Sequence, residues 1–395
     1  MKSYRQTLEQ LGDGGMLRRL RPYGRCGGST IEDGGRALLN LSSNDYLGLA
    51  GDSVLLTAFY QTMATDGPAL LERFALGTAS SRLLTGDTAV AHRLEARLAG
   101  LYGRPALLFN SGYHANIGIL PALLGKNDLI LSDKLNHASL HDGLRIGRAS
   151  CKRFNHRDYT HLRRLLERER QRYERVVIVS ESVFSMDGDC GDLARLVALK
   201  REFDCLLYVD EAHAIGVRGE RGLGLAEEDG LLAEVDLLVG TFGKACGSVG
   251  AFLICSEDIR DYLINHSRSL IFTTALPPVV LSWNLFVLER IPAMAEQRRR
   301  LRLLSDRFRG VLLEWQLPTA GSTNIVPVII GSAERTVAGA AYLREQGFLV
   351  LPVRPPTVPH GTSRFRLSLT AALGWEQIEG LPGLIGDWLV GGRMS

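Results

Sequence analysis

The stretch Leu206-Leu207-Tyr208-Val209-Asp210-Glu211-Ala212-His213 joins a short apolar run to two acids and a histidine. Similar apolar runs recur between residues 100 and 255, and helix-length amphipathic segments separate them. These runs are residues 106–109, 129–131, 176–179, 237–239 and 251–254. Short apolar strands that alternate with helices are typical of βαβ units, in which helices cover both faces of a mostly parallel sheet. The sequence therefore predicts a three-layer α/β domain.

Several of these runs end in a polar residue. The endings are Asn110, Ser132-Asp133, Ser180-Glu181, Asp210 and Thr241. In open α/β sheets, ligands bind in the crevice beyond the carboxyl ends of the strands. The polar endings therefore predict one candidate site at that edge of the sheet.

The remaining sequence divides around this domain. Residues 1–50 are rich in glycine and arginine and predict an N-terminal arm, and residues 51–285 form the large domain that carries the candidate site. Residues 286–395 contain Phe365-Arg366-Leu367-Ser368-Leu369, which alternates between apolar and polar residues. This alternation predicts a half-exposed antiparallel sheet and hence a smaller α+β C-terminal domain.

Composition limits the class of protein. The 395 residues are 45% hydrophobic and 23% charged, as in a globular protein, and the net charge of +3 is too small to indicate a nucleic-acid partner. The six cysteines form no C-x-x-C pair, so we expect free thiols in the cytoplasm. The longest uncharged stretch, residues 270–288, is interrupted by Pro277-Pro278, so we expect no membrane span.

Lys244 lies in Thr241-Phe242-Gly243-Lys244-Ala245-Cys246-Gly247, directly after the apolar run 237–239. Small neighbours leave its amine poorly solvated, which suits a lysine that forms a Schiff base. The alternative is a surface lysine in a glycine-rich loop. Asp210 at the end of a buried strand would supply a complementary charge, which favours the first interpretation.

Two other kinds of site are not favoured. Asp210-Glu211 after an apolar strand is also found in nucleotide hydrolases, but these need G-x-x-x-x-G-K-[ST], which neither Gly-Lys pair of the chain provides. His137 and His141 have metal-ligand spacing, but no H-E-x-x-H motif accompanies them. We therefore expect no metal centre.

The candidate residues together match the needs of pyridoxal phosphate. This cofactor needs an anchoring lysine, an acid at its pyridine nitrogen, a phosphate cradle and a group over the ring. Lys244 and Asp210 supply the first two. A helix that starts at Gly112-Tyr113 would direct backbone N–H groups at the phosphate. His137 is placed to stack on the ring, and His213 to reach the phenolic oxygen.

Four segments of the chain resemble the α-oxoamine synthases, which are pyridoxal-phosphate enzymes of fold type I. The segments are residues 42–48, 185–189, 210–213 and 241–244. Enzymes of this family condense an amino acid with an acyl thioester and release carbon dioxide. The resemblance implies a homodimer with sites at the interface, where Thr273-Thr274 would approach the partner's cofactor.

The resemblance also implies roles for individual residues. Lys244, His137 and Asp210 would be the catalytic residues. Phosphate contacts would come from Gly112, Tyr113 and Thr241, other cofactor contacts from Ser185 and His213, and substrate contacts from Arg18 and Thr357.

The segment that indicates a particular branch of the family is Arg354-Pro355-Pro356-Thr357-Val358-Pro359. This segment is similar to that of family members that act in biotin synthesis, which implies L-alanine and pimeloyl-CoA or pimeloyl-acyl carrier protein as substrates. The product would be 8-amino-7-oxononanoate. One alternative is a sibling enzyme that uses glycine and acetyl-CoA, and another is a binding protein that has kept the fold without the activity.

Overall fold

The computed structural model describes residues 3–63 and 67–391, which divide into two compact units. The large unit comprises residues 54–184 and 190–298. The small unit comprises residues 1–53, 185–189 and 299–395. The sequence analysis expected boundaries at residues 50 and 285 and assigned each domain one continuous stretch of chain. The small unit is instead discontinuous, because it also includes the loop 185–189. Each unit is described separately below.

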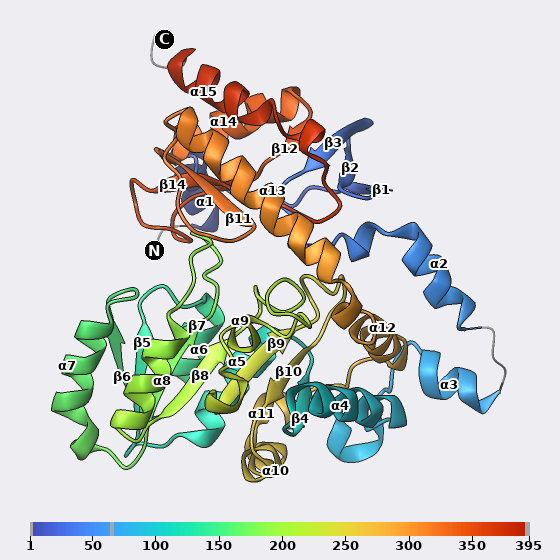
Figure 1. Ribbon diagram of the computed structural model, residues 1–395, viewed down its shortest axis with the longest axis vertical. Coiled ribbons are helices and arrows are strands. Elements are labelled where there is room, and N and C mark those ends of the chain that lie inside the picture. Colours follow the sequence, from blue (N-terminus) through green and yellow to red (C-terminus); the bar gives the residue numbers. More distant parts are fainter. Residues whose placement is uncertain (1–2, 64–66, 392–395) are drawn as a thin grey trace. The chain divides into compact units, whose positions relative to one another are not determined.

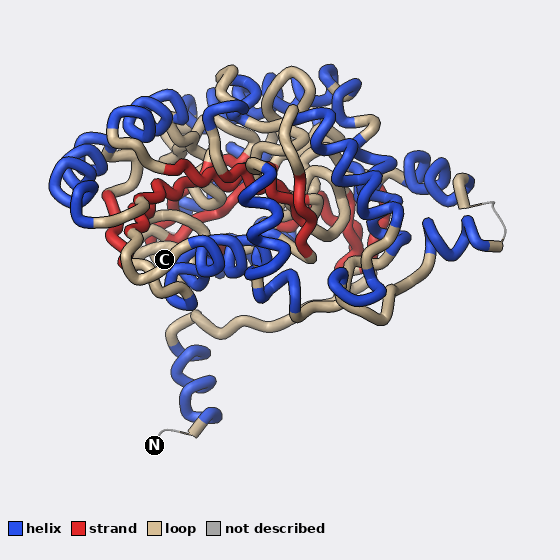
Figure 2. The backbone as a smooth tube through the Cα atoms, turned by 90° about the horizontal axis from the view of Figure 1, so that it is seen from below, coloured by secondary structure: helices blue, strands red, loops and turns tan. Residues whose placement is uncertain are grey.

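The large unit is built on a seven-stranded sheet with the order β4-β10-β9-β8-β7-β5-β6. Only β10 is antiparallel to its neighbours, so the sheet is mostly parallel, as predicted. Figure 2 shows helices on either side of the strands. In chain order the strands are β4 (Ala106–Phe109), β5 (Leu129–Asp133), β6 (Ser150–Phe154), β7 (Val176–Glu181), β8 (Leu206–Asp210), β9 (Leu237–Thr241) and β10 (Ala251–Ile254).

The connections between these strands are mainly helical, which confirms the three-layer α/β architecture (Figure 1). The helices are α2 (Ser53–Gln61), which begins at the last residue of the small unit, α3 (Pro68–Phe74), α4 (Ala89–Tyr102), α5 (Gly112–Leu123), α6 (Ala138–Ile146), α7 (Tyr159–Glu169), α8 (Leu193–Glu202), α9 (Leu225–Glu228), α10 (Glu257–His266), α11 (Arg268–Ile271) and α12 (Pro278–Leu288).

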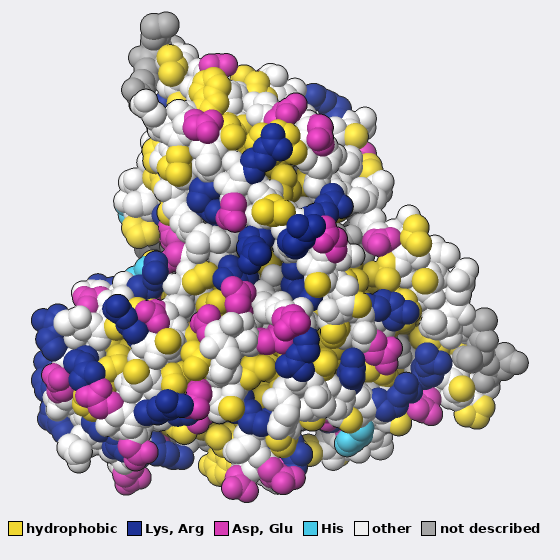
Figure 3. Space-filling model, in the orientation of Figure 1, with side chains coloured by type: hydrophobic (Ala, Val, Ile, Leu, Met, Phe, Trp, Pro, Cys, Tyr) yellow, Lys and Arg dark blue, Asp and Glu magenta, His cyan; other side chains and the backbone are white. Residues whose placement is uncertain are grey.

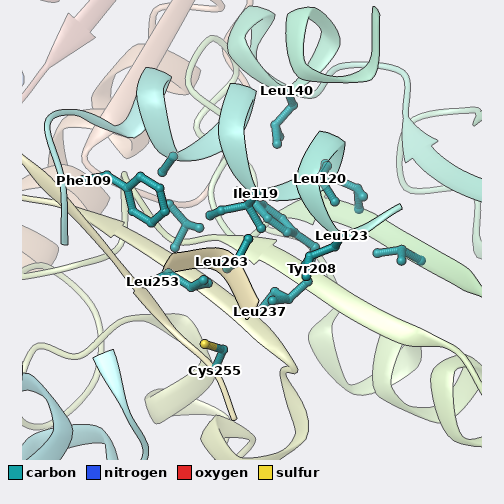
Figure 4. Close-up of a cluster of buried hydrophobic side chains, with 14 of the residues drawn as sticks. Phe109, Ile119, Leu120, Leu123, Leu140, Tyr208, Leu237, Leu253, Cys255 and Leu263 are labelled. Carbon is teal, nitrogen blue, oxygen red and sulfur yellow. The ribbon is translucent and has the colours of Figure 1, made fainter. Parts of the chain in front are cut away.

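A hydrophobic core cluster of the large unit lies between α5 and the sheet (Figure 4). Ile119 and Leu120 of α5 are fully buried, as are Tyr208 of β8 and Leu237 of β9. Burying one such aliphatic side chain stabilises a fold by roughly 1.5–3 kcal/mol. The core therefore fixes α5 over the middle strands of the sheet.

Helix α6 packs closely against α5 because of a glycine. A methyl group placed on Gly143 of α6 would clash with the backbone carbonyl oxygen of Asn116 in α5 and would lie 3.2 Å from its carbonyl carbon. Real Cβ atoms essentially never lie as close to another atom as this one would to the carbonyl oxygen, so a side chain here would push the helices apart. The glycine thus sets the spacing of two helices that both carry candidate site residues.

Among the described residues, the small unit contains two small sheets and four α-helices (Figure 1). One sheet has the order β1-β2-β3-β12 and the other is the antiparallel sheet β11-β14-β13. The strands are β1 (Gly24–Gly27), β2 (Thr30–Asp33), β3 (Arg36–Asn40), β11 (Ile325–Gly331), β12 (Phe348–Leu349), β13 (Pro352–Val353) and β14 (Ser363–Ser368). The helices are α1 (Tyr4–Asp13), α13 (Ala295–Glu314), which begins in the large unit, α14 (Ala333–Glu345) and α15 (Leu381–Gly391).

Strand β14 is antiparallel as predicted, but the expected half-exposed pattern is wrong because every residue of the strand is buried. Its polar positions are occupied by Arg364 and Arg366, which bind the loop 185–189. The guanidinium of Arg364 pairs with the carboxylate of Asp187, and that of Arg366 donates to the carbonyl of Ser185. Alternation along this strand therefore reflects internal hydrogen bonding and not exposure to solvent.

The longest uncharged stretch, residues 270–288, was expected not to span a membrane. Residues 278–288 form the largely buried helix α12, and no described helix has the length and hydropathy needed to cross a membrane. Basic and acidic side chains are mixed on the surface over α7 (Figure 3). Arg163 of this helix pairs with Glu202 at 2.5 Å, so its charge is partly neutralised locally.

Candidate active site

Asp210 ends β8, between β7 and β9, where the strands of the large unit open towards a ligand. It is 6% exposed. Its Oδ1 accepts a hydrogen bond from the backbone N–H of Ala212 at 2.9 Å, and its Oδ2 accepts one from Nδ2 of Asn116 at 2.8 Å. Both donors are N–H groups, so each carboxyl oxygen of Asp210 acts as an acceptor towards the protein.

Lys244 lies in a tightly hydrogen-bonded loop that follows the neighbouring strand β9. The hydroxyl of Thr241 donates to the carbonyl of Gly250 at 3.0 Å and accepts the N–H of Gly243 at 3.0 Å. The indole N–H of Trp283 donates to the carbonyl of Cys246 at 3.2 Å. Gly250 has a φ of 110°, which a residue with a side chain rarely adopts. The half-buried lysine is therefore held on a rigid backbone.

His137 is the residue before α6, and its backbone and ring are both held. Its backbone N–H donates to the carboxyl group of Glu181, and its Nδ1 lies 2.7 Å from the hydroxyl of Ser139. Burial lowers the pKa of the ring even though part of the residue is open to solvent. The charge of Asp210 opposes this shift, and that of Lys244 adds to it. These three predicted catalytic residues therefore lie within electrostatic range of one another.

The predicted phosphate cradle is the start of α5. The hydroxyl of Ser111 caps this helix by accepting the N–H of His114 at 3.2 Å. Among the described residues, the backbone N–H groups of Gly112 and Tyr113 have no hydrogen-bond partner. A Cβ on Gly112 would meet nothing within 4 Å, so space is open beside these donors. Free donors at a helix N-terminus with space beside them suit a phosphate group.

Two further side chains of this site had no role assigned to them from the sequence. Glu181 ends β7 and lies in register with Asp210 on β8. Burial, helped by the charge of Asp210, raises the pKa of Glu181 well above its usual range. Asn116 binds Asp210 directly. The polar ending Ser180-Glu181 was a signal for the first, whereas an asparagine within a helix gave no signal for the second.

The remaining predicted residues divide between the units. Thr241 and His213 lie in the large unit, and His213 is buried. Ser185, Arg18 and Thr357 lie in the small unit, where Nη2 of Arg18 donates to the hydroxyl of Thr357 at 3.2 Å. The structure thus brings the two predicted substrate residues together. Arg354 supports the same segment by donating to the carbonyl of Leu17 at 2.8 Å.

The large-unit residues fit pyridoxal phosphate. They provide free N–H donors at a helix start, a buried acceptor at a strand end and a lysine on a rigid loop. The fold is that of the pyridoxal-phosphate enzymes of fold type I.

Comparison with known proteins gives the family. The chain belongs to the aminotransferase class I and II family, whose model matches residues 36–381. It is 49% identical over 382 residues to a putative 8-amino-7-oxononanoate synthase of Pasteurella multocida, covering 96% of this chain and 97% of the relative. It is 52% identical over 365 residues to the 8-amino-7-oxononanoate synthase of Chlorobaculum parvum, covering 92% and 93%.

Solved structures agree with this assignment. A variant of the serine palmitoyltransferase of S. paucimobilis, with a bound pyridoxal-phosphate–myriocin aldimine, superposes with a TM-score of 0.89. The two chains are 28% identical, and the match covers 99% of this chain and 98% of that one.

Proposed function

We propose that this protein is an 8-amino-7-oxononanoate synthase, which condenses L-alanine with a pimeloyl thioester and releases carbon dioxide and the free thiol. The observation that carries the proposal is the identity of 49% and 52%, over more than nine tenths of each chain, to relatives of that name. The seven carbons of the pimeloyl group and two of the three alanine carbons then make up the nine-carbon product.

Bound pyridoxal phosphate supplies an electron sink for the negative charge that forms at the alanine Cα. In the proposed roles, Lys244 anchors the cofactor and, once freed by the substrate amine, takes the Cα proton as general base. Asp210 keeps a proton on the pyridine nitrogen by presenting a buried carboxylate to it. These roles agree with the rigid loop around Lys244 and the two N–H donors that hold Asp210.

The other proposed roles concern binding. Gly112, Tyr113 and Thr241 bind the phosphate, and His137 stacks on the ring. Ser185 and His213 contact the cofactor, and Arg18 with Thr357 binds the substrate. The hydrogen bond between Arg18 and Thr357 supports the last assignment, because it places a cation and a hydroxyl in one cluster.

We further propose a cytoplasmic homodimer in which Thr273-Thr274 approaches the partner's cofactor. Within one subunit, the amide of Asn110 donates to the hydroxyl of Thr273 at 3.2 Å and to the carbonyl of Thr274 at 2.7 Å. This segment is therefore held in a fixed conformation within its own subunit.

The test is a substrate panel with the purified holoenzyme. L-Alanine, glycine and L-serine are each combined with pimeloyl-CoA, pimeloyl-acyl carrier protein and acetyl-CoA, and the released thiol and the amino ketone are measured. We expect alanine with a pimeloyl thioester to give the highest kcat/KM. Preference for glycine with acetyl-CoA would replace the proposal by the sibling activity. A protein that binds no coloured cofactor and turns over no pair would be a binding protein of the same fold.

A further inference from the structure

Asn116 lies one helical turn after Gly112 in α5, and its side chain makes three hydrogen bonds inside the large unit. The residue is 1% exposed. Its Nδ2 donates to Oδ2 of Asp210 at 2.8 Å and to the hydroxyl oxygen of Ser139 at 2.9 Å. Its Oδ1 accepts from the hydroxyl of Tyr208 at 2.5 Å. Both N–H groups of the amide and its oxygen are therefore used.

The orientation of this amide follows from its neighbours. An ionised carboxylate only accepts hydrogen bonds, so the Asn116 atom that faces Asp210 must be the nitrogen. The amide oxygen then faces Tyr208, whose hydroxyl must donate. Tyr208 is fully buried in the core beneath α5 (Figure 4), and burial raises its pKa well above 10. Its hydroxyl group thus keeps its proton and remains a donor.

The direction of the hydrogen bonds continues to His137. The hydroxyl oxygen of Ser139 accepts from Asn116, which leaves its own proton for Nδ1 of His137, 2.7 Å away. The backbone N–H of Ser139 also donates to this Nδ1, at 3.2 Å. A backbone N–H cannot accept, so the hydroxyl and the backbone N–H of Ser139 together favour the tautomer in which Nδ1 is unprotonated. The ring proton of the neutral imidazole is then on Nε2.

We propose that Asn116 is a positioning residue that couples two cofactor-facing groups. It holds Asp210 as an ionised acceptor and, through Ser139, holds His137 as the neutral tautomer with its proton on Nε2. One chain of directed hydrogen bonds, which begins at the Tyr208 hydroxyl, thereby sets both the acid at the pyridine nitrogen and the ring over the cofactor face. The proposal rests on the cofactor site of the proposed function and is independent of which amino acid or thioester reacts.

The coupling has a chemical consequence for each end. Asp210 receives N–H groups from Asn116 and Ala212, so a lone pair remains for a cofactor N–H. His137 in the Nε2–H form is uncharged and presents a single donor beyond the network. A neutral imidazole stacks on a ring without adding a second positive charge beside Lys244. Loss of Asn116 would disturb both ends, whereas loss of Ser139 would disturb only His137.

The first experiment determines the tautomer directly. Holoenzyme with 15N-labelled histidine is studied by magic-angle-spinning NMR, and His137→Gln identifies the His137 signals among those of the nine histidines. We expect Nδ1 to be unprotonated and Nε2 protonated in the wild type. Asn116→Leu weakens the hydroxyl donor to Nδ1 and Ser139→Ala removes it, while the backbone N–H of residue 139 remains, so each variant should add a minor population with Nδ1 protonated. A protonated Nδ1 in the wild type would overturn the proposal.

The second experiment measures the pyridoxal phosphate dissociation constant from the visible absorbance of the bound cofactor. Asn116→Leu leaves Asp210 with one donor and should weaken binding about 10- to 100-fold, since a buried partner is lost. Tyr208→Phe removes the hydrogen bond to the Asn116 amide oxygen but keeps the amide itself, so it should weaken cofactor binding less than Asn116→Leu does. Ser139→Ala should leave the dissociation constant within about twofold of the wild type, because it does not touch Asp210.

A matched control separates coupling from a loss of stability. Asn324 is also buried, at 3% exposure, but its amide donates to the carbonyl of Leu369 in the small unit. Asn324→Leu should lower the midpoint of thermal unfolding without altering the tautomer or the cofactor affinity. If Asn116→Leu behaves like Asn324→Leu in both readouts, Asn116 is only structural and the proposal fails. Cofactor binding and tautomer are measured without substrate, so failure of the proposed reaction would not alter either result.

Discussion

The cofactor side of the large unit and the Arg18–Thr357 cluster of the small unit are built in different ways. Asp210 and Asn116 are buried, and each has several hydrogen-bond partners. Arg18 and Thr357 are exposed and share one hydrogen bond. Removing one member of a buried hydrogen-bond network costs much free energy, whereas an exposed polar contact contributes little to stability or binding. With the roles proposed above, we expect substitutions in the buried network to affect the chemical step most and substitutions in the small-unit cluster to affect substrate binding.

The largest effect should follow from Lys244→Ala. Removal of the anchoring amine and general base should lower kcat at least about 10³-fold. Borohydride treatment of the wild-type holoenzyme, followed by peptide mass spectrometry, should find the cofactor on Lys244. Lys200, which pairs with Asp236 at 2.8 Å, offers a control, and Lys200→Ala should keep most of the activity. Labelling of another lysine would contradict the assignment.

Asp210→Asn should come next, with kcat lowered by about 10²- to 10³-fold. An asparagine has one acceptor oxygen for the two N–H donors that now bind the carboxylate, and it does not hold the pyridine proton by charge. The absorbance spectrum of the bound cofactor and kcat are measured together. Asp236→Asn changes an acid near the opposite end of β8, where it accepts the Leu207 N–H at 2.7 Å, and should leave the spectrum unchanged. If Asp236→Asn lowered kcat as much as Asp210→Asn, the effect would come from the loss of a structural carboxylate and not from the place of Asp210 in the site.

A pH effect on stability should arise from Glu211, which is fully buried and accepts the N–H groups of Leu225 and Ala226. Burial raises its pKa from 4.5 to about 7. At a pH between 4.5 and about 7, Glu211 is therefore protonated in the folded state and ionised in the unfolded state. Because the folded state binds the extra proton, the free energy of unfolding falls as the pH rises through this range. Denaturant unfolding at pH 5 and pH 8 should show the wild type losing up to about 3 kcal/mol relative to Glu211→Gln. A pH-independent difference would contradict this prediction.

The smallest effect is expected at the small-unit cluster. Thr357→Val removes the hydroxyl that accepts from Arg18, and it should raise KM for the acyl thioester about fivefold with kcat nearly unchanged. Thr362→Val is a matched control, because that hydroxyl bonds locally to the carbonyl of Pro359. If Thr357→Val lowers kcat as strongly as Asp210→Asn does, the proposed division of labour between the two regions is wrong.

Sequence patterns predicted the sheet well because its strands are buried on both faces. The runs at 106–109 and 251–254 coincide with β4 and β10, and the polar endings Asp210 and Thr241 lie at the ends of neighbouring strands. Strand β14 was misjudged because its alternating arginines are satisfied by the loop 185–189, and alternation alone does not distinguish such partners from water.

The part of the site that sequence did not predict depends on contacts between distant segments. Asn116 binds Asp210, which is 94 residues away, and Ser139, which is 23 residues away. Neither partner has a fixed spacing from Asn116 that a motif would record. Such a network becomes visible only when packing places α5 over β8.

The spacing between α5 and α6 depends on the absence of a side chain at Gly143. The network between α5 and α6 exists only at a helix spacing that one added methyl group would prevent. Position 143 therefore controls the site indirectly. It contacts no reacting group, but its lack of a side chain determines whether Asn116 and Ser139 are close enough to form a hydrogen bond. Variants with side chains of increasing size at this position would therefore lower cofactor retention in steps. Substitutions of the catalytic residues would also change cofactor retention, but they would change the reaction rate at the same time.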